Sequence, residues 1–244
     1  TPNPEEGYMA YHLDWNNGKM NGFENSSGPQ SLMYYTSYQL GALWSLAEEY
    51  SLADHYFSPV LSESAPNTLF YVAGFSPVIN DYGPPPYVPF NQTIFYELNS
   101  YGISWGFYTY NGSPVDPWEY IYGIDKYTNH LHSWQEFLSE LENNTLPSVT
   151  WIFSQDFQDY DMGPPKEILQ GELFLLYLIN KIETSPVWNS TAIFVTWDEF
   201  GGFYDHVSPP SVDGLQYGPR VPLIIISPYS KEDYVSHTLM THLL

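Results

Sequence analysis

The fold of this chain is constrained most strongly by a succession of short apolar strands around one amphipathic helix in its C-terminal half. Residues 148–154 ("SVTWIFS") and 190–197 ("STAIFVTW") are rich in β-branched and aromatic side chains, which predicts buried strands. Residues 166–185 carry apolar side chains at helical spacing, and residues 220–230 ("RVPLIIISPYS") predict a further buried strand. Strand, helix, strand and strand in this order indicate an α/β domain with a largely parallel sheet.

The N-terminal half predicts helices and irregular segments. Apolar side chains at helical spacing predict a helix over residues 31–50. A second helix is expected to begin near Ser64, with this serine as its N-cap, and to end at Gly74. Residues 76–118 are dense in Pro, Gly, Tyr and Asn, which predicts loops with short strands. We find no repeat and no long linker, so we expect a single domain over residues 1–244.

The charge balance excludes one class of partner. The chain has 28 Asp and Glu against 6 Lys and Arg, a net charge of −22 at pH 7, which repels nucleic-acid backbones. No run of apolar residues is long enough to predict a transmembrane helix. Most of the carboxylates would be neutral near pH ~3, so we expect a protein that works outside the cell in acid.

Other features of the composition also favour secretion. The chain has no cysteine, which excludes disulfides and thiol chemistry. Five Asn-x-Ser/Thr sequons predict N-linked glycans, at Asn25, Asn91, Asn111, Asn143 and Asn189.

The segment "TWDEFGGFYDHV" concentrates candidate functional residues directly after a predicted strand. Asp198 and Glu199 could bind a divalent cation, share a proton as an acid/base pair, or form a solvated acidic turn. The Gly-Gly pair that follows lets the backbone reverse and bring Asp205 and His206 toward the same space. His206 could then be a general acid or a metal ligand, or a histidine hydrogen-bonded to the backbone.

Long motifs in this chain resemble a known family. The segments "TWDEFGGFYDHVSPP" and "GPRVPLIIISPYSKEDYVSHT" resemble the phosphoesterase family of bacterial and archaeal phospholipases C and acid phosphatases. "WNNGKMNGF", "MYYTSYQLGALWSLAEEYSLADHYF" and "LPSVTWIF" agree with it in the same order. The resemblance implies the α/β/α sandwich of the alkaline-phosphatase-like superfamily and hydrolysis of phosphoric esters with one divalent metal ion. We expect a secreted, archaeal member.

The resemblance also implies roles for the first group of site residues. Ser64, in "SESAPNTLF", matches the nucleophile that also contacts the metal ion, although locally it is an ordinary helix N-cap. Asn67 follows in the same motif as a supporting residue. Asp198 and Glu199 match the adjacent acidic pair that binds the metal ion.

Further residues are expected to protonate or support the substrate. His132 matches a family histidine near the phosphate, with His130 as a rival for that position, and His206 is a second candidate proton donor. Asp205 and Arg220 would support the site. Arg220 is the only arginine of the chain, and a structural ion pair is the alternative for it.

Three departures from the family pattern bear on activity. The family's Glu-Asn pair should precede "WNNGKMNGF"; the similar Glu24-Asn25 lies after it and is interpreted as a coincidence. Gly163 stands where the family has a histidine, which would remove a candidate proton donor. We also expect that the first strand, with the Glu-Asn motif, and the last helix are missing from this sequence.

The sequence therefore predicts a metal-dependent, acid phosphatase-like hydrolase with a serine nucleophile. Phospholipase C activity on phospholipid head groups is the alternative within enzymes. A secreted glycoprotein that keeps the fold without activity, as a surface or matrix component, is the alternative of another class.

Overall fold

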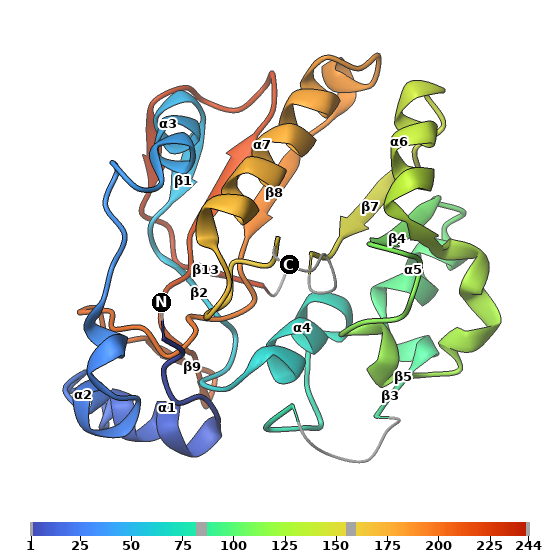
Figure 1. Cartoon of the computed structure of the whole chain (residues 1–244). Coiled ribbons are helices and arrows are strands. Elements are labelled where there is room, and N and C mark those ends of the chain that lie inside the picture. Colours follow the sequence, from blue (N-terminus) through green and yellow to red (C-terminus); the bar gives the residue numbers. More distant parts are fainter. Residues whose placement is uncertain (1, 82–86, 155–159, 243–244) are drawn as a thin grey trace.

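The computed structural model describes residues 2–81, 87–154 and 160–242, in which two β-sheets lie side by side (Figure 1). The four-stranded sheet has the order β12-β1-β11-β8. Its strands are β12 (Tyr234–Ser236), β1 (Ser51–Ala53), β11 (Leu223–Ile226) and β8 (Ile193–Thr196). The three-stranded sheet has the order β6-β4-β7. Its strands are β6 (Leu131–Ser133), β4 (Trp105–Thr109) and β7 (Val149–Ile152).

In each of the two sheets, most strands run in the same direction. The three-stranded sheet is entirely parallel. In the four-stranded sheet β12 is parallel to β1, and β11 is antiparallel to both β1 and β8. Three of these four strands therefore share one direction, and β11 alone opposes it. The α/β class is confirmed, as are the strands predicted within residues 148–154, 190–197 and 220–230.

Short pairings complete the sheet structure. They join β2 (Tyr56–Phe57) with β13 (Met240–Thr241), β3 (Val88–Pro89) with β5 (Ile121–Tyr122), and β9 (Ser211–Val212) with β10 (Leu215–Gln216). Short 3-10 helices connect other elements, at Pro29–Leu32, Phe90–Gln92, Trp118–Tyr120, Ile124–His130 and Trp188–Ser190.

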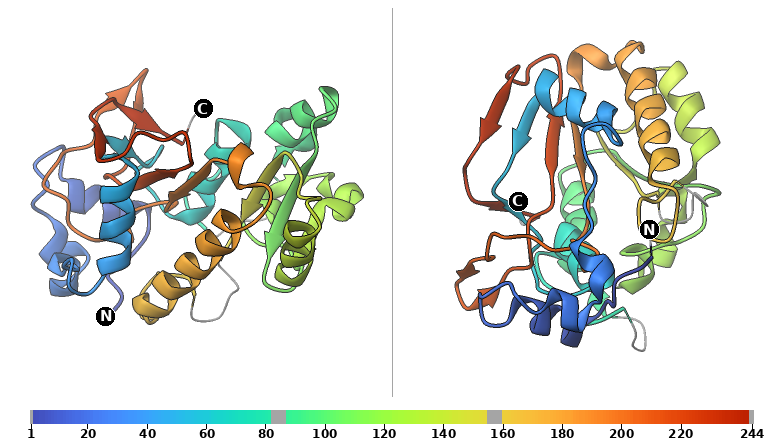
Figure 2. Two further views of the ribbon diagram at one scale, coloured as in Figure 1. Left: turned by 90° about the horizontal axis from the view of Figure 1, so that it is seen from above. Right: turned by 60° about the vertical axis from the view of Figure 1, so that its left-hand side comes forward.

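The helix α7 (Ile168–Glu183) lies between the two halves of the molecule (Figures 1 and 2). Leu178 and Ile182 pack with α6 (Trp134–Glu142), which covers the three-stranded sheet. Ile179 packs instead with α3 (Gly41–Glu49) and with the apolar side chains of β8 and β11. The predicted helix over residues 166–185 is thus confirmed, and it contributes to the cores of both sheets.

The central strand β4 is buried along its whole length because helices cover both of its faces. Trp105 and Phe107 point into the cluster that also holds residues of α4 (Ser64–Ala73) and α5 (Ile94–Ser100). Tyr108 points to the opposite face, into the cluster with α6 and α7. This alternation follows the two-residue period of a strand and makes a three-layered α/β/α arrangement here.

Several local predictions differ from the structure. Only Gly41–Glu49 of the helix predicted over 31–50 is helical; the preceding Tyr34 and Tyr38 are 81% and 96% exposed, so no burial supports a helix there. The helix α4 begins at Ser64 and ends before Gly74, but Glu63 rather than Ser64 holds the N-cap position. Strand β8 is an edge strand with Phe194 63% exposed, so it is not fully buried. Helix α5 lies in a segment predicted as loops and short strands.

No helix among the described residues is long and apolar enough to cross a membrane.

The N-terminal segment encloses a carboxyl group away from solvent. The helices α1 (Tyr8–Trp15) and α2 (Phe23–Ser26) pack their apolar side chains against Phe200. Asp14 of α1 is fully buried and accepts a hydrogen bond of 2.6 Å from the Ser27 hydroxyl. Burial raises the pKa of Asp14 to about 6, although the hydrogen bond from Ser27 acts in the opposite direction.

Replacing Asp14 with Asn is expected to weaken the pH dependence of stability. Because the folded state holds the Asp14 proton more tightly than the unfolded chain, the free energy of unfolding rises as pH falls from about 7 to about 4. A pKa raised from 3.8 to about 6 corresponds to a gain of about 3 kcal/mol. Urea unfolding across this range should show a smaller gain in Asp14→Asn. Asp213→Asn, which alters an exposed carboxylate, should behave like the wild type.

Candidate functional site

Two adjacent carboxylates, Asp198 and Glu199, lie directly after strand β8. Desolvation raises the pKa of Asp198 above its ordinary value. Desolvation and the neighbouring charge of Asp198 raise the pKa of Glu199 well above its ordinary value. Glu199 also accepts a 2.7 Å hydrogen bond from the Gly201 amide, and the Tyr11 hydroxyl lies close enough to act against the rise in its pKa. Keeping both carboxyl groups ionised at the same time is therefore costly in free energy.

The structure brings Ser64 to this pair. Ser64 is the first residue of α4, and its hydroxyl lies close enough to Asp198 to act against the rise in the pKa of that carboxyl group. Deeper in the molecule, the Tyr71 hydroxyl of the same helix donates to the Trp197 carbonyl oxygen over 3.2 Å. The imidazole of His242 stacks on the Tyr71 ring at 4.0 Å between ring centroids. Helix α4 therefore contacts the end of β8 both at its first residue and at Tyr71.

Three further carboxylates surround the pair and were not predicted. The charges of Glu6 and Asp81 act on Glu199 and Asp198, respectively. Asp81 accepts a 2.7 Å hydrogen bond from the Ala65 amide at the start of α4, and its own amide donates to Glu63 over 3.1 Å. We call Glu6, Glu63, Asp81, Asp198 and Glu199 the acidic centre. No local pattern marks its first three members, because they meet the others only through the fold.

The chemistry of the acidic centre suits a divalent cation, but among the described residues no three of its carboxylates bring ligand atoms within 4.8 Å of one another. Among the residues that the structure describes, the ion pairs made by Lys or Arg involve Asp161 and Asp205, so no basic side chain neutralises this centre. Carboxylate and hydroxyl oxygens are the ligands that hard divalent cations prefer. Asp198, Glu199 and Ser64 together supply such oxygen ligands where the local charge favours cation binding.

Asn67 supports the site through the backbone. Its side-chain oxygen accepts from the Val60 amide at 3.0 Å, and its nitrogen donates to the carbonyl oxygens of Ser62 and Glu63 at 2.7 and 2.9 Å. All of these contacts hold the segment that enters α4 just before Ser64. Asn67 is fully buried, and its hydrogen bonds fix the backbone just before Ser64.

The Gly-Gly turn carries Asp205 to Arg220. The guanidinium donates two hydrogen bonds to the Asp205 carboxylate, of 2.7 Å from Nε and 2.8 Å from Nη2. Although burial acts to raise it, the Arg220 hydrogen bonds hold the pKa of Asp205 below its ordinary value. The His206 side chain is 76% exposed and lies 3.6 Å from Asp205.

The other sequence candidates lie in various surroundings. His132 is in β6, stacks on Tyr108, and lies 3.9 Å from both Glu136 and Glu140. His130 stacks on Trp105 at 3.9 Å between centroids, a packing role. The Gly163 amide donates a hydrogen bond to Asp161.

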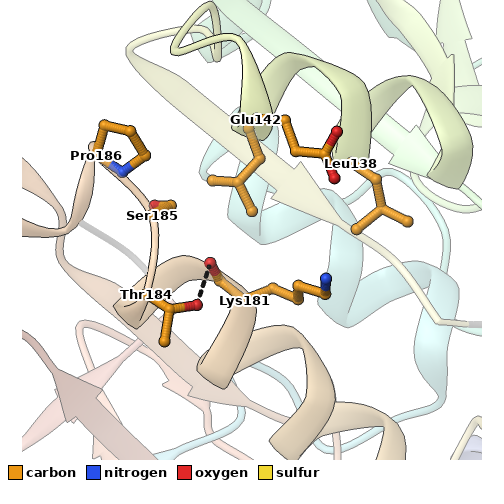
Figure 3. Close-up of a pocket in the computed structure, with 7 residues that line it drawn as sticks. Leu138, Glu142, Lys181, Thr184, Ser185 and Pro186 are labelled. Atoms are coloured by element: carbon orange, nitrogen blue, oxygen red, sulfur yellow. Dashed lines mark hydrogen bonds between the residues drawn. The ribbon is translucent and has the colours of Figure 1, made fainter.

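A surface pocket lies away from the acidic centre, between α6 and the end of α7 (Figure 3). Its volume is about 260 Å³, and Leu138, Leu141, Glu142, Lys181, Thr184, Ser185 and Pro186 line it. None of these residues belongs to the acidic centre. A second pocket, of about 440 Å³, includes Glu6 among its lining residues and so borders the centre.

Replacing Gly202 with Ala tests whether the turn after Glu199 requires glycine. Gly202 has φ +72°, and a Cβ atom there would meet Pro4 Cβ at 2.8 Å and Glu5 O at 3.2 Å. We expect a loss of stability of about 3 kcal/mol, from backbone strain plus overpacking. Gly214→Ala is the control, because Gly214 has φ +83° with no atom within 4 Å of a Cβ. Equal losses of unfolding free energy in both variants would contradict the steric part.

Comparisons with known proteins identify relatives of this chain. The sequence pattern of the Phosphoesterase family matches residues 1–243. Phospholipase C A of Mycobacterium tuberculosis is 26% identical over 310 residues, which cover 99% of this chain and 58% of that protein. Non-specific phospholipase C6 of Arabidopsis thaliana is 28% identical over 219 residues, covering 78% of this chain and 41% of that protein. This chain thus spans at most about three fifths of these relatives.

Solved structures share the fold at low sequence identity. The lipoteichoic acid synthase LtaP of Listeria monocytogenes aligns with a TM-score of 0.52 and 10% identity, over 83% of this chain and 62% of that chain. At this identity the likeness shows that the two chains share a fold. By the family pattern that extends over nearly its whole length, the chain belongs to the Phosphoesterase family.

Proposed function

We propose that this chain carries the catalytic site of a phosphoric ester hydrolase, with Ser64 as the nucleophile. The observation that carries the proposal is the closeness of the Ser64 hydroxyl to Asp198, at the N-terminal end of α4. A hydroxyl placed there lies beside the positive end of the helix dipole, which favours a phosphate. Membership of the Phosphoesterase family supports the same reaction class.

The reaction needs a cation at the acidic centre. We propose that Asp198, Glu199 and Ser64 hold one divalent metal ion. When bound, this ion would neutralise charge on the phosphoryl group and lower the pKa of the serine hydroxyl. The hydrogen bond from the Gly201 amide orients Glu199 for this role.

The chain's own residues then account for the bond changes. The Ser64 Oγ atom attacks phosphorus, gives its proton to a solvent water, and forms a phosphoserine while the bond to the leaving oxygen breaks. The leaving oxygen takes a proton from His132 or from the exposed His206, and water later releases phosphate from Ser64. In acid, hydronium ions can supply the same proton.

Asp81 connects the reaction to pH. Its carboxylate accepts a hydrogen bond from the Ala65 amide at the start of α4, where a substrate phosphate would bind. Burial and the charge of Glu63 raise the pKa of Asp81, so acid neutralises a competing charge. This competition, together with the net charge of −22 at pH 7, favours turnover of anionic substrates in acid.

Phospholipase C activity is the second candidate. The relatives from Mycobacterium tuberculosis and Arabidopsis thaliana both carry this name. The two candidates share the attack by Ser64 and differ in the leaving group, which is an alkyl or aryl oxygen for a phosphatase and a diacylglycerol oxygen for a phospholipase C.

Hydrolysis of an aryl phosphate is the first measurement, from about pH 2 to about pH 8, with divalent metal added or removed by a chelator. We expect an acidic optimum and loss of turnover with the chelator. Ser64→Ala should lower kcat by at least about 1,000-fold, because the nucleophile is lost. Ser133→Ala is the control, since Ser133 also begins a helix, as the N-cap of α6, but lies outside the acidic centre.

Phosphatidylcholine vesicles are tested alongside under the same conditions. Turnover of the lipid but not of the aryl phosphate would assign a phospholipase C. A folded, metal-loaded protein without turnover of either would contradict the enzyme and favour an inactive glycoprotein. Equal activity of Ser64→Ala and wild type would contradict the role of Ser64.

We also propose that the protein is secreted and carries N-linked glycans. The acceptor side chains of all five sequons are exposed: Asn25, Asn91, Asn111, Asn143 and Asn189. Protein from its native host should lose mass on enzymatic removal of N-glycans, and peptide mapping should place the modification at these asparagines. An unchanged intact mass would contradict the proposal.

A further inference from the structure

A second group of potential metal ligands lies outside the acidic centre. Asp54 directly follows β1, His55 follows Asp54, and His237 directly follows β12. Strands β1 and β12 are neighbours in the sheet, with Ala53 paired to Ser236, so their ends bring the three side chains together. One potential ligand atom from each residue lies within 4.8 Å of the others.

Both imidazoles converge on one carboxylate. The Nδ1 atom of His55 lies 2.8 Å from Asp54 Oδ1. The Nδ1 atom of His237 lies 2.9 Å from Oδ1 and 2.8 Å from Oδ2. The two rings lie 6.0 Å apart at 83°, so neither blocks the other. The three donors therefore surround one small space instead of forming separate pairs.

The backbone on both sides of this group is fixed. The Asp54 amide donates to the Ser236 carbonyl oxygen over 3.1 Å, and the Met240 amide donates to the His55 carbonyl oxygen over 3.0 Å. Arg220 Nη1 donates to the Asp54 carbonyl oxygen over 3.2 Å. Ligands whose backbones are held in this way lose little freedom when an ion binds, which favours binding.

We propose that Asp54, His55 and His237 bind one divalent transition-metal ion of the zinc type, at a site separate from the acidic centre. Two imidazole nitrogens with one carboxylate oxygen are a donor set typical of zinc and its neighbours, whereas magnesium and calcium prefer oxygen alone. The two histidine side chains are 44% and 72% exposed, so the ion keeps a position open to water. The site does not depend on the proposed hydrolysis.

Zinc binding by the metal-free chain tests the proposal. Zinc ions are titrated against a competing chromophoric chelator in excess magnesium, which occupies the oxygen ligands of the acidic centre. We expect His237→Ala and His55→Asn each to weaken zinc binding by at least about tenfold. His206→Ala is the matched control, because His206 also lies beside an aspartate, Asp205, but without a third ligand. It should bind zinc like the wild type.

A spectroscopic measurement keeps the test independent of activity. Cobalt(II) bound by the wild type should show intense visible absorption from a four-coordinate nitrogen–oxygen site, and His237→Ala should lose it. Because the His237 side chain is 72% exposed, its replacement should leave the circular dichroism spectrum unchanged. Equal zinc affinity of wild type and His237→Ala, or an equal loss in His206→Ala, would overturn the proposal.

Discussion

The candidate site depends on one junction, between the start of α4 and the end of β8. The Ser64 hydroxyl lies close to Asp198 at this junction, and the Tyr71 hydroxyl donates a hydrogen bond to the Trp197 carbonyl oxygen. Asn67 fixes the segment that leads into the helix. Every feature proposed for catalysis follows from this joint, because it places a helix N-terminus, a hydroxyl and two carboxylates at one point.

The same junction concentrates negative charge that the fold alone does not neutralise. The charges of the five carboxylates of the acidic centre act on one another there. The ion pairs that Lys and Arg make among the described residues lie elsewhere. Such a centre favours protonation or a bound cation over the fully ionised form. An ion bound there stabilises the folded state and supports the chemistry at the same time.

The parts of the structure that local sequence determines were predictable. The strand before Asp198 and the helix α7 both follow from periodicity, and the capping box of Ser133 and Glu136 marks the start of α6, a signal available in the sequence. The neighbours of the site were not predictable in this way. Asp54 and His237 are 183 residues apart, and only the pairing of β1 with β12 brings them together. The exposed tyrosines before Gly41 mimic a helix pattern without a surface to pack on.

The edge strands of the two sheets are positions at which a further strand can pair. Strands β12 and β8 end the four-stranded sheet, and β6 and β7 end the three-stranded sheet. Phe194 of the edge strand β8 is exposed. An edge strand with unpaired backbone N–H and C=O groups is a template for a further strand, so pairing at such an edge would extend a sheet of this chain into a second chain.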